Sequence, residues 1–294
     1  IRDFCLSRGL GDVYKRQPTA LQLELVPLNE YLEKNTTYTQ KAHTHNFYQI
    51  IWFAKGKGTH YVDFKEYEVS PHQLFFIGKG QIHAFDNQPY EGFVIHFNKI
   101  FLADEVDTLD IFLKHNIFDT FSQKPYLSLA PEEVPKWHQL IDKMQEELEN
   151  SEAFAHTDYL KNLLHLLLIK IQRFFLKEDR KQLSINDPKH LLFIRFCEAV
   201  EQHFKTLHTV KEYAKLLHIS TKNLTNCTNE LIQQTPLALI NERLSLEAKR
   251  LLTYTDDSVS KIAYTLGFEN SSNFIRFFKR LNGIAPSFFK KIIV

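Results

Sequence analysis

Four polar side chains early in the chain have the types and the spacing to bind a ligand. His43, His45 and Gln49 are separated by even numbers of residues, so in an extended strand they share one face, and His83 follows in a later segment. Imidazole and amide groups can hydrogen-bond a polar molecule, and imidazoles also bind metal ions. A neutral amide gives a cation less charge than a carboxylate, so the expected affinity for iron, manganese or zinc is low. An effector-binding role and an ordinary structural role both remain open.

Aromatic residues near these four can give a small ligand apolar contact and stacking. They are Tyr48, Trp52, Tyr61 and Phe85. The combination suits a sugar, an aromatic acid or a urea-like molecule, although each ring can equally belong to a core. His60, His72 and His96 are expected to be ordinary strand or turn residues. We predict no bound metal, because Gln49 is a weak partner for a cation, and no cofactor. We also predict no catalytic residue, because no pair of general acid and base is evident.

A second group of polar and basic residues, near the C-terminus, is suited to DNA. It forms two sets about 50 residues apart: Thr221, Lys222, Asn223, Thr225 and Asn226, then Ser271, Ser272, Asn273, Arg276, Lys279 and Arg280. Asn prefers adenine and Lys prefers guanine, whereas cations on phosphates supply non-specific affinity. The first set has Asn226, Asn229 and Glu230 where the second has three cations. The second set is therefore predicted to anchor the protein electrostatically, and the first to contribute mainly base reading.

An internal repeat predicts the helices that position both sets. Apolar residues recur at the i, i+3, i+4, i+7 spacing from Val210 and again, 49 residues later, from Val259. After one extra residue in the second turn, the copies stay in step at an offset of 50 as far as Pro236 and Pro286. Each copy predicts a short helix, a tight turn and a second helix that projects into a major groove.

The signals that end and join these helices are also present. Thr209 and Glu212 have capping-box spacing in the first copy, and Gly267 supplies the turn of the second. An apolar stripe from Leu237 to Leu252 predicts one continuous connecting helix. Sixteen residues span about 24 Å. With the width of the two units added, this length suits recognition helices about one DNA turn, or about 34 Å, apart.

Charge and composition agree with a DNA-binding C-terminal part. Residues 187–294 carry 15 Lys or Arg against 10 Asp or Glu, whereas residues 18–186 carry 17 against 23. The net charge of +1 hides this asymmetry, and a nucleic acid is expected at the positive half. The three cysteines form no disulfide framework or metal motif, which favours a cytoplasmic location. No apolar run reaches the roughly 18 residues of a membrane-spanning helix.

The first part of the chain is predicted to consist of short strands followed by two helices. Aromatic and β-branched residues between turn signals indicate strands over Phe47 to Ala54, Thr59 to Asp63, Gln73 to Ile77 and Gly92 to Phe97. Closely spaced strands favour a small barrel or sandwich. Amphipathic helices are predicted over Pro131 to Glu149 and Thr157 to Lys177.

Two stretches resemble a known family. SVSKIAYTLGFENSSNFIRFFKRLNGIAP, from Ser258 to Pro286, resembles the C-terminal signature of AraC-type transcription regulators, and the resemblance extends from about Asn186 to the end. HTHNFYQIIWFAKGKGTHYVDFKEYEVSPHQLFFIGKGQIHAF, from His43 to Phe85, resembles the cupin-type sensor domain of many such regulators. The resemblance implies two helix-turn-helix units joined by a helix, and a β-barrel that holds a small-molecule effector. In metal-binding cupins, a glutamate stands where this chain has Gln49.

The resemblance also implies that the second amphipathic helix is a dimerisation element. Its apolar stripe is wide enough to contact both its own barrel and a partner, although a monomer with these helices packed only on the barrel stays open. The stripe consists of Leu160, Leu163, Leu164, Leu167, Leu168 and Ile171.

The predicted fold class is α+β: a cupin-like β-barrel with a helical dimerisation element, then an all-α domain of two helix-turn-helix units. The segments are 18–130 for the sensor, 131–178 for the dimerisation element, 179–188 for a linker and 189–294 for the DNA-binding domain. Residues 1–17 are expected to be a translated sequencing adapter, because VYKRQ corresponds to one frame of a transposon end.

The predicted function is an effector-responsive transcription regulator that reads two adjacent major-groove segments. Its expected partners are double-stranded DNA, an unidentified small-molecule effector, a second copy of the chain and RNA polymerase. The alternative is a metal-dependent cupin enzyme or metal sensor fused to a DNA-binding module.

Overall fold

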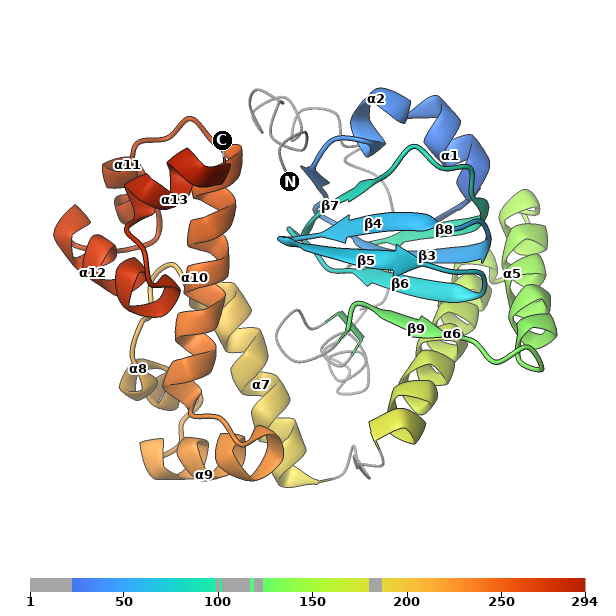
Figure 1. The fold of residues 1–294 in the computed structure, drawn as a ribbon. Helices are drawn as coiled ribbons and strands as arrows, with labels where there is room; N and C mark the ends of the chain where they lie inside the picture. The colour runs from blue at the N-terminus through green and yellow to red at the C-terminus, as the bar shows by residue number, and fades with distance from the viewer. Residues whose placement is uncertain (1–22, 99–100, 102–116, 119–123, 180–186, 294) are drawn as a thin grey trace. The chain divides into compact units, whose positions relative to one another are not determined.

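The computed structural model describes residues 23–98, 101, 117–118, 124–179 and 187–293 (Figure 1). Contacts divide the chain into two compact units. We call them the N-terminal unit, whose described residues fall within 23–179, and the C-terminal unit, described over 187–293. The segment 1–17 and most of the predicted linker 179–188 lie outside the described residues. Among the described residues, no helix is long and apolar enough to cross a membrane.

The N-terminal unit is built on two antiparallel sheets. The five-stranded sheet has the order β1-β8-β3-β6-β9 and the four-stranded sheet has the order β2-β7-β4-β5. The strands of the first are β1 (Leu23–Pro27), β8 (Glu91–Phe97), β3 (Tyr48–Lys55), β6 (Gln73–Ile77) and β9 (Tyr126–Ser128). Those of the second are β2 (His43–Thr44), β7 (Ile82–Phe85), β4 (Gly58–Val62) and β5 (Lys65–Val69).

Alternation along the strands separates an inner from an outer face. On β3, Ile51 and Phe53 belong to a buried cluster that also includes Val62 and Phe85 of the other sheet, so this cluster lies between the sheets. The intervening Trp52 points the opposite way, and its ring lies 4.5 Å from that of His138. The core of the unit is therefore the space between the two sheets.

Helices accompany the sheets. Two short ones, α1 (Leu28–Lys34) and α2 (Thr36–Thr39), follow β1, and α5 (Val134–Glu149) and α6 (His156–Asp179) cover the outer face of the five-stranded sheet (Figure 1). A ring contact shows the packing of α6 on this sheet: the ring centroids of Phe175 on α6 and Phe76 on β6 are 5.5 Å apart.

The predicted strands and helices of this unit are all present, with bounds shifted by up to three residues. The sequence analysis missed α1, α2 and the strands β1, β2, β5, β7 and β9. Several of these have only two to five residues, which is too short for a periodic pattern to show.

The C-terminal unit is entirely helical. It contains α7 (Pro188–His203), α8 (Val210–Leu216), α9 (Thr221–Ile232), α10 (Pro236–Tyr254), α11 (Val259–Thr265), α12 (Ser271–Asn282) and α13 (Pro286–Ile293). The pairs α8–α9 and α11–α12 are the two predicted helix-turn-helix copies, and Figure 1 shows α10 running between them. The connecting helix α10 has 19 residues, a little longer than predicted.

Side-chain caps start these helices at defined residues. The predicted capping box is present: Thr209 Oγ1 accepts from the backbone N–H of Glu212, whose carboxylate accepts from the N–H of Thr209. Ser220 caps α9 and Asn270 caps α12 in the same way, each accepting from the N–H three residues on. The first residues of both second helices are thus fixed in place.

The repeat extends to the backbone conformation. The turn of the first copy has His218 at φ 56°, and the turn of the second has Gly267 at φ 78°. After the second helices, Gln233 at φ 57° and Gly283 at φ 77° again occupy the left-handed region. The copies differ in that only the second has glycine, which reaches this region without steric cost, at both positions.

Gly267→Ala is expected to destabilise the C-terminal unit far more than Gly283→Ala. A Cβ at residue 267 would lie 2.0 Å from the Lys205 carbonyl oxygen, whereas one at residue 283 would have nothing within 4 Å. Gly283→Ala should therefore cost only the left-handed penalty of about 1–2 kcal/mol. Gly267→Ala adds a backbone clash and should cost more than about 4 kcal/mol. Denaturant unfolding followed by circular dichroism measures both, and equal losses would contradict this packing.

Candidate DNA-binding surface and interior ligand site

The two second helices of the repeat present their predicted DNA-contacting residues to solvent. On α9, Thr221, Lys222, Asn223 and Asn226 are exposed and Thr225 is half-buried. On α12, Ser272, Arg276, Lys279 and Arg280 are exposed, and Ser271 and Asn273 are half-buried. The opposite faces are anchored in the core through Leu224 and Phe274, which are both fully buried and stand at equivalent positions of the repeat.

The exposed faces of α9 and α12 differ in charge. Arg276, Lys279 and Arg280 give α12 three exposed cations, and Arg276 donates to Asn273 Oδ1 across 2.6 Å. On α9, Glu230 forms an ion pair with Lys189 of α7, which offsets its negative charge. Lys189 of the neighbouring helix therefore neutralises the one acidic side chain of α9. Sequence spacing did not predict this pair.

The interior of the N-terminal unit contains two rows of polar residues, one on each sheet. Across β1, β8 and β3, Glu24, His96 and Gln49 stand in register. Gln49 Nε2 lies 2.7 Å from His96 Nε2, and His96 Nδ1 lies 3.0 Å from a Glu24 carboxylate oxygen. Across β2 and β7, His43 stands opposite His83. The register of the strands brings these residues together.

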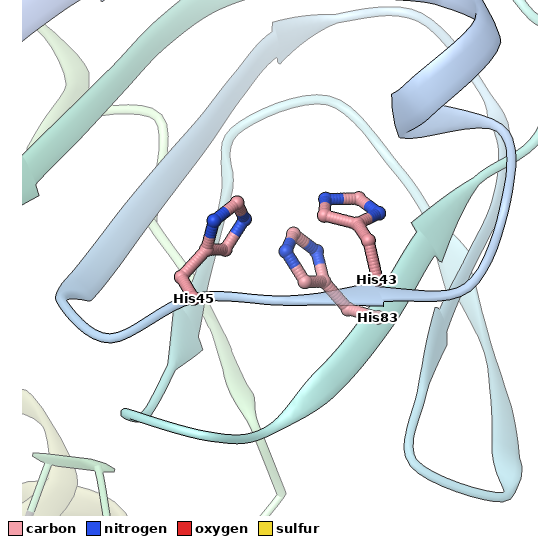
Figure 2. Close-up of side chains that lie close together, drawn as sticks. All are labelled: His43, His45 and His83. Atoms are coloured by element: carbon pink, nitrogen blue, oxygen red, sulfur yellow. The ribbon is translucent and has the colours of Figure 1, made fainter. Parts of the chain in front are cut away.

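Three imidazoles gather in this interior, shown in Figure 2. We call His43, His45 and His83 the imidazole trio, because each offers a nitrogen and these nitrogens lie within 4.8 Å of one another. The rings of His43 and His83 have centroids 4.2 Å apart, and that of His45 is 5.0 Å from His83. Tyr38 of α2 lies beside the trio, with its ring 4.2 Å from that of His43.

Burial keeps these imidazoles neutral. Desolvation lowers the pKa of His43 to about 4, although its hydrogen bond to the Lys41 carbonyl acts in the opposite direction. Desolvation also holds the pKa of His45 and of His83 well below the usual value, and the neighbouring imidazoles add to this effect. The pKa of His60 falls to about 3 for the same main reason. Neutral rings carry lone pairs, so they can accept hydrogen bonds or bind a cation.

Several buried nitrogens in this group have no hydrogen-bond partner. The Nε2 atoms of His43, His45 and His83 are all buried and unpaired. A buried polar atom without a partner costs about 1–3 kcal/mol, and such atoms are rare in folded proteins. Their concentration in one place makes the interior the candidate ligand site.

Five of the eight residues predicted to bind an effector line this interior. They are His43, His45, Gln49, His83 and Phe85, whose ring is 4.5 Å from that of His60. His60 and His96 lie on β4 and β8, as strand residues, and their side chains also belong to this buried group. Finding them required the register between strands, because neither shows a spacing signal of its own.

The other three predicted effector contacts do not belong to this group. Trp52 and Tyr48 alternate with Gln49 on β3 and therefore point to the outer face, where Tyr48 contacts Phe97 and Phe118. Tyr61 is half-buried and alternates with the inward-facing His60 and Val62 on β4. A ligand bound by the imidazoles cannot contact these three rings, so their assignment is corrected.

The six apolar residues predicted for dimerisation are buried within the single chain. Leu164, Leu167, Leu168 and Ile171 are completely covered, and Leu160 and Leu163 nearly so. They pack within the N-terminal unit. Among the described side chains of α6, the large apolar ones that are exposed are Tyr159 and Leu166. The stripe is wide because it fills a core, so its width no longer indicates a partner contact at these six positions.

Two family models match the chain and together cover most of it. The AraC-like ligand binding domain matches residues 30–167, and a helix-turn-helix domain matches residues 213–292. The order of these domains agrees with the β-rich and all-helical units seen here. The chain belongs to the AraC family of transcription regulators. Its α8–α9 and α11–α12 pairs belong to the helix-turn-helix DNA-binding domain of an AraC-family regulator, and its β-rich unit corresponds to the ligand-binding domain.

Relatives of this AraC-family chain are also named as transcription regulators. The HTH-type transcriptional activator RhaS of Enterobacter is 23% identical over 81% of this chain and 83% of its own length. The uncharacterised regulator YisR of Bacillus subtilis is 28% identical over 42% of this chain, and the match spans only 44% of YisR. The crystal structure of ToxT from Vibrio cholerae aligns over 92% of this chain and 97% of its own, at 14% identity, with a TM-score of 0.38.

Proposed function

We propose that this regulator reads two successive major-groove segments of double-stranded DNA, with α9 in one and α12 in the other. The observation that carries the proposal is the equivalence of the two helices: each has a polar exposed face, and each is anchored in the same core by Leu224 or Phe274. The 19-residue α10 between the copies is about 28 Å long. This length suits a spacing of about one DNA turn, roughly 34 Å, once helix widths are added.

In this proposal the two helices contribute unequally. The three cations of α12 contact phosphates and supply most of the salt-dependent affinity. The polar residues Thr221, Asn223 and Asn226 of α9 read base edges, for which amide side chains are suited. The regulator acts in the compartment that holds its DNA, and RNA polymerase is a further partner through which bound protein would affect transcription.

The barrel interior is the proposed effector site, and its role is regulatory rather than catalytic. The support is the group of buried, neutral imidazoles beside Gln49 and Phe85. An effector changes DNA binding only if it binds one arrangement of the protein more tightly than another.

Self-association is proposed through α6. Its buried stripe is not available to a partner, so the contact is assigned to the exposed side chains of Tyr159 and Leu166. A homodimer would place four recognition helices on DNA, which raises affinity through the effective concentration of the second half.

Arg276→Ala is expected to weaken DNA binding and to lower the salt dependence more than Asn226→Ala does. Removing one phosphate contact reduces the slope of log affinity against log salt by about 1, whereas losing a base contact changes sequence preference instead. Fluorescence anisotropy over a series of salt concentrations measures the slope. The division of labour is wrong if both variants change the slope equally.

Leu166→Glu is expected to reduce self-association and leave thermal stability unchanged, because the side chain is 45% exposed. Leu164→Ala is the matched control, because Leu164 lies two residues earlier on the same helix and is fully buried. It should cost about 2–5 kcal/mol of stability by leaving a cavity. Sedimentation velocity and thermal unfolding separate the two effects. A dimer that persists unchanged in Leu166→Glu would remove α6 from the proposed interface.

A further inference from the structure

The tautomer of His43 is set by its surroundings, and that of His83 is coupled to His60. His43 Nδ1 lies 2.8 Å from the Lys41 carbonyl oxygen, which can only accept, so this nitrogen carries the proton. The Nε2 atom of the neutral ring is then a free lone pair. His83 Nδ1 lies 3.3 Å from His60 Nε2, a contact that either ring can donate. In the tautomer in which His83 donates, its Nε2 is also a free lone pair.

This arrangement matches the surroundings of histidines that bind metal ions. A ligating imidazole usually donates its second N–H to a carbonyl, a carboxylate or another acceptor, which fixes the ring and the tautomer. His43 has a backbone carbonyl in this position and His83 has another imidazole. The Nδ1 atoms of His43 and His83 thus have the kind of neighbour that a metal-binding histidine needs. Their Nε2 atoms, in contrast, have no hydrogen-bond partner.

Each ring of the trio offers a nitrogen close to the other two rings, and none of the three Nε2 atoms has a hydrogen-bond partner. All three Nε2 atoms of the trio are buried and unpaired, and each residue offers a nitrogen within 4.8 Å of the others. Nitrogens bound to one tetrahedral ion at about 2.1 Å are roughly 3.4 Å apart, so small rotations of the rings bring them to bonding distance. Figure 2 shows the rings side by side, with His43 and His83 on paired strands.

We propose that His43, His45 and His83 bind one divalent first-row transition-metal ion, and that this ion is the ligand of the sensor barrel. The inference rests on the proposed sensing role of the barrel and names the chemical class of its ligand. Three imidazoles without a carboxylate favour nickel, cobalt, copper or zinc over magnesium, calcium and manganese, which prefer oxygen ligands. Three protein ligands leave at least one position for water or a small anion.

Binding would join segments that are otherwise weakly connected. The strand β2 has two residues and pairs only with β7, and His45 follows it directly. An ion held by both segments would link β2 to β7 and fix Tyr38, which packs against His43 and His45. The ion would thus order the start of the barrel around α2.

The test uses the full chain, freed of metal with a chelator and then dialysed separately against nickel, cobalt, zinc, manganese and magnesium salts. Bound metal is measured by elemental analysis, and thermal unfolding is followed in parallel. A single nickel, cobalt or zinc ion per chain is expected, with a raised melting temperature. Manganese and magnesium should bind at least about 100-fold more weakly, because the site offers nitrogen and no carboxylate.

Matched variants identify the ligands. His43→Gln, His45→Gln and His83→Gln should each lower the metal affinity by at least about 100-fold. Losing a residue that only hydrogen-bonds a ligand already costs up to about 100-fold, and losing the ligand itself should cost no less. His138→Gln, an exposed histidine on α5, should bind metal like the parent chain. Cobalt absorption spectra of the parent chain give a second readout that does not depend on the folding of any variant. The proposal is overturned if the folded parent chain binds no ion, or if the trio variants bind as tightly as His138→Gln.

DNA binding measured on the same samples separates this inference from the proposed function. Sequence-specific DNA binding without any metal binding would refute the metal site and leave the regulator intact. Metal bound by the trio, in a chain that selects no DNA sequence with or without the ion, would support the site and refute the proposed DNA reading.

Discussion

Helices α9 and α12 are anchored in one hydrophobic core, and the proposed DNA reading depends on this constraint. Leu224 of α9, Phe274 of α12 and Ile240 of α10 are fully buried in the same cluster. An ion pair adds to it: the buried Arg243 of α10 contacts the exposed Glu201 of α7 at 2.7 Å and Glu247 of its own helix at 3.0 Å, and it lies over the Phe204 ring at 3.8 Å. The shared apolar core therefore sets the spacing of α9 and α12, because interiors are close-packed and resist rearrangement.

The tandem repeat could be predicted from the sequence because each of its helices is specified by residues close together in the chain. Its signals are local: apolar residues at helical spacing, caps three residues before the residue they bond, and glycine in a left-handed turn. Even so, His218 and Gln233 occupy left-handed positions without glycine, and only the alignment of the two copies indicates this. The ion pair between Lys189 and Glu230 joins residues far apart in the sequence and was missed for that reason.

The interior site was predicted only in part, because it depends on register between strands. Spacing selected His43, His45 and Gln49, but the expectation that they share one face of a single strand was wrong: His43 lies on β2 of the four-stranded sheet and Gln49 on β3 of the five-stranded sheet. His96 joins them through its place opposite Gln49 on β8. Tyr48 and Trp52 are close to Gln49 in the sequence, but alternation along β3 places them on the outer face. The buried leucines of α6 show a similar limit: a wide apolar stripe is equally typical of a core helix and of an interface.

The central claim is that α9 and α12 read two adjacent DNA segments as one rigid pair. The most direct test has two steps. The full chain first selects its motif from random DNA, and its binding is then measured to that motif and to a version with five base pairs inserted between the two halves. We expect two half-motifs about one helical turn apart, and a loss of binding after the insertion, which turns one half to the opposite side of the duplex. A single short motif, or equal binding to the expanded site, would contradict the claim.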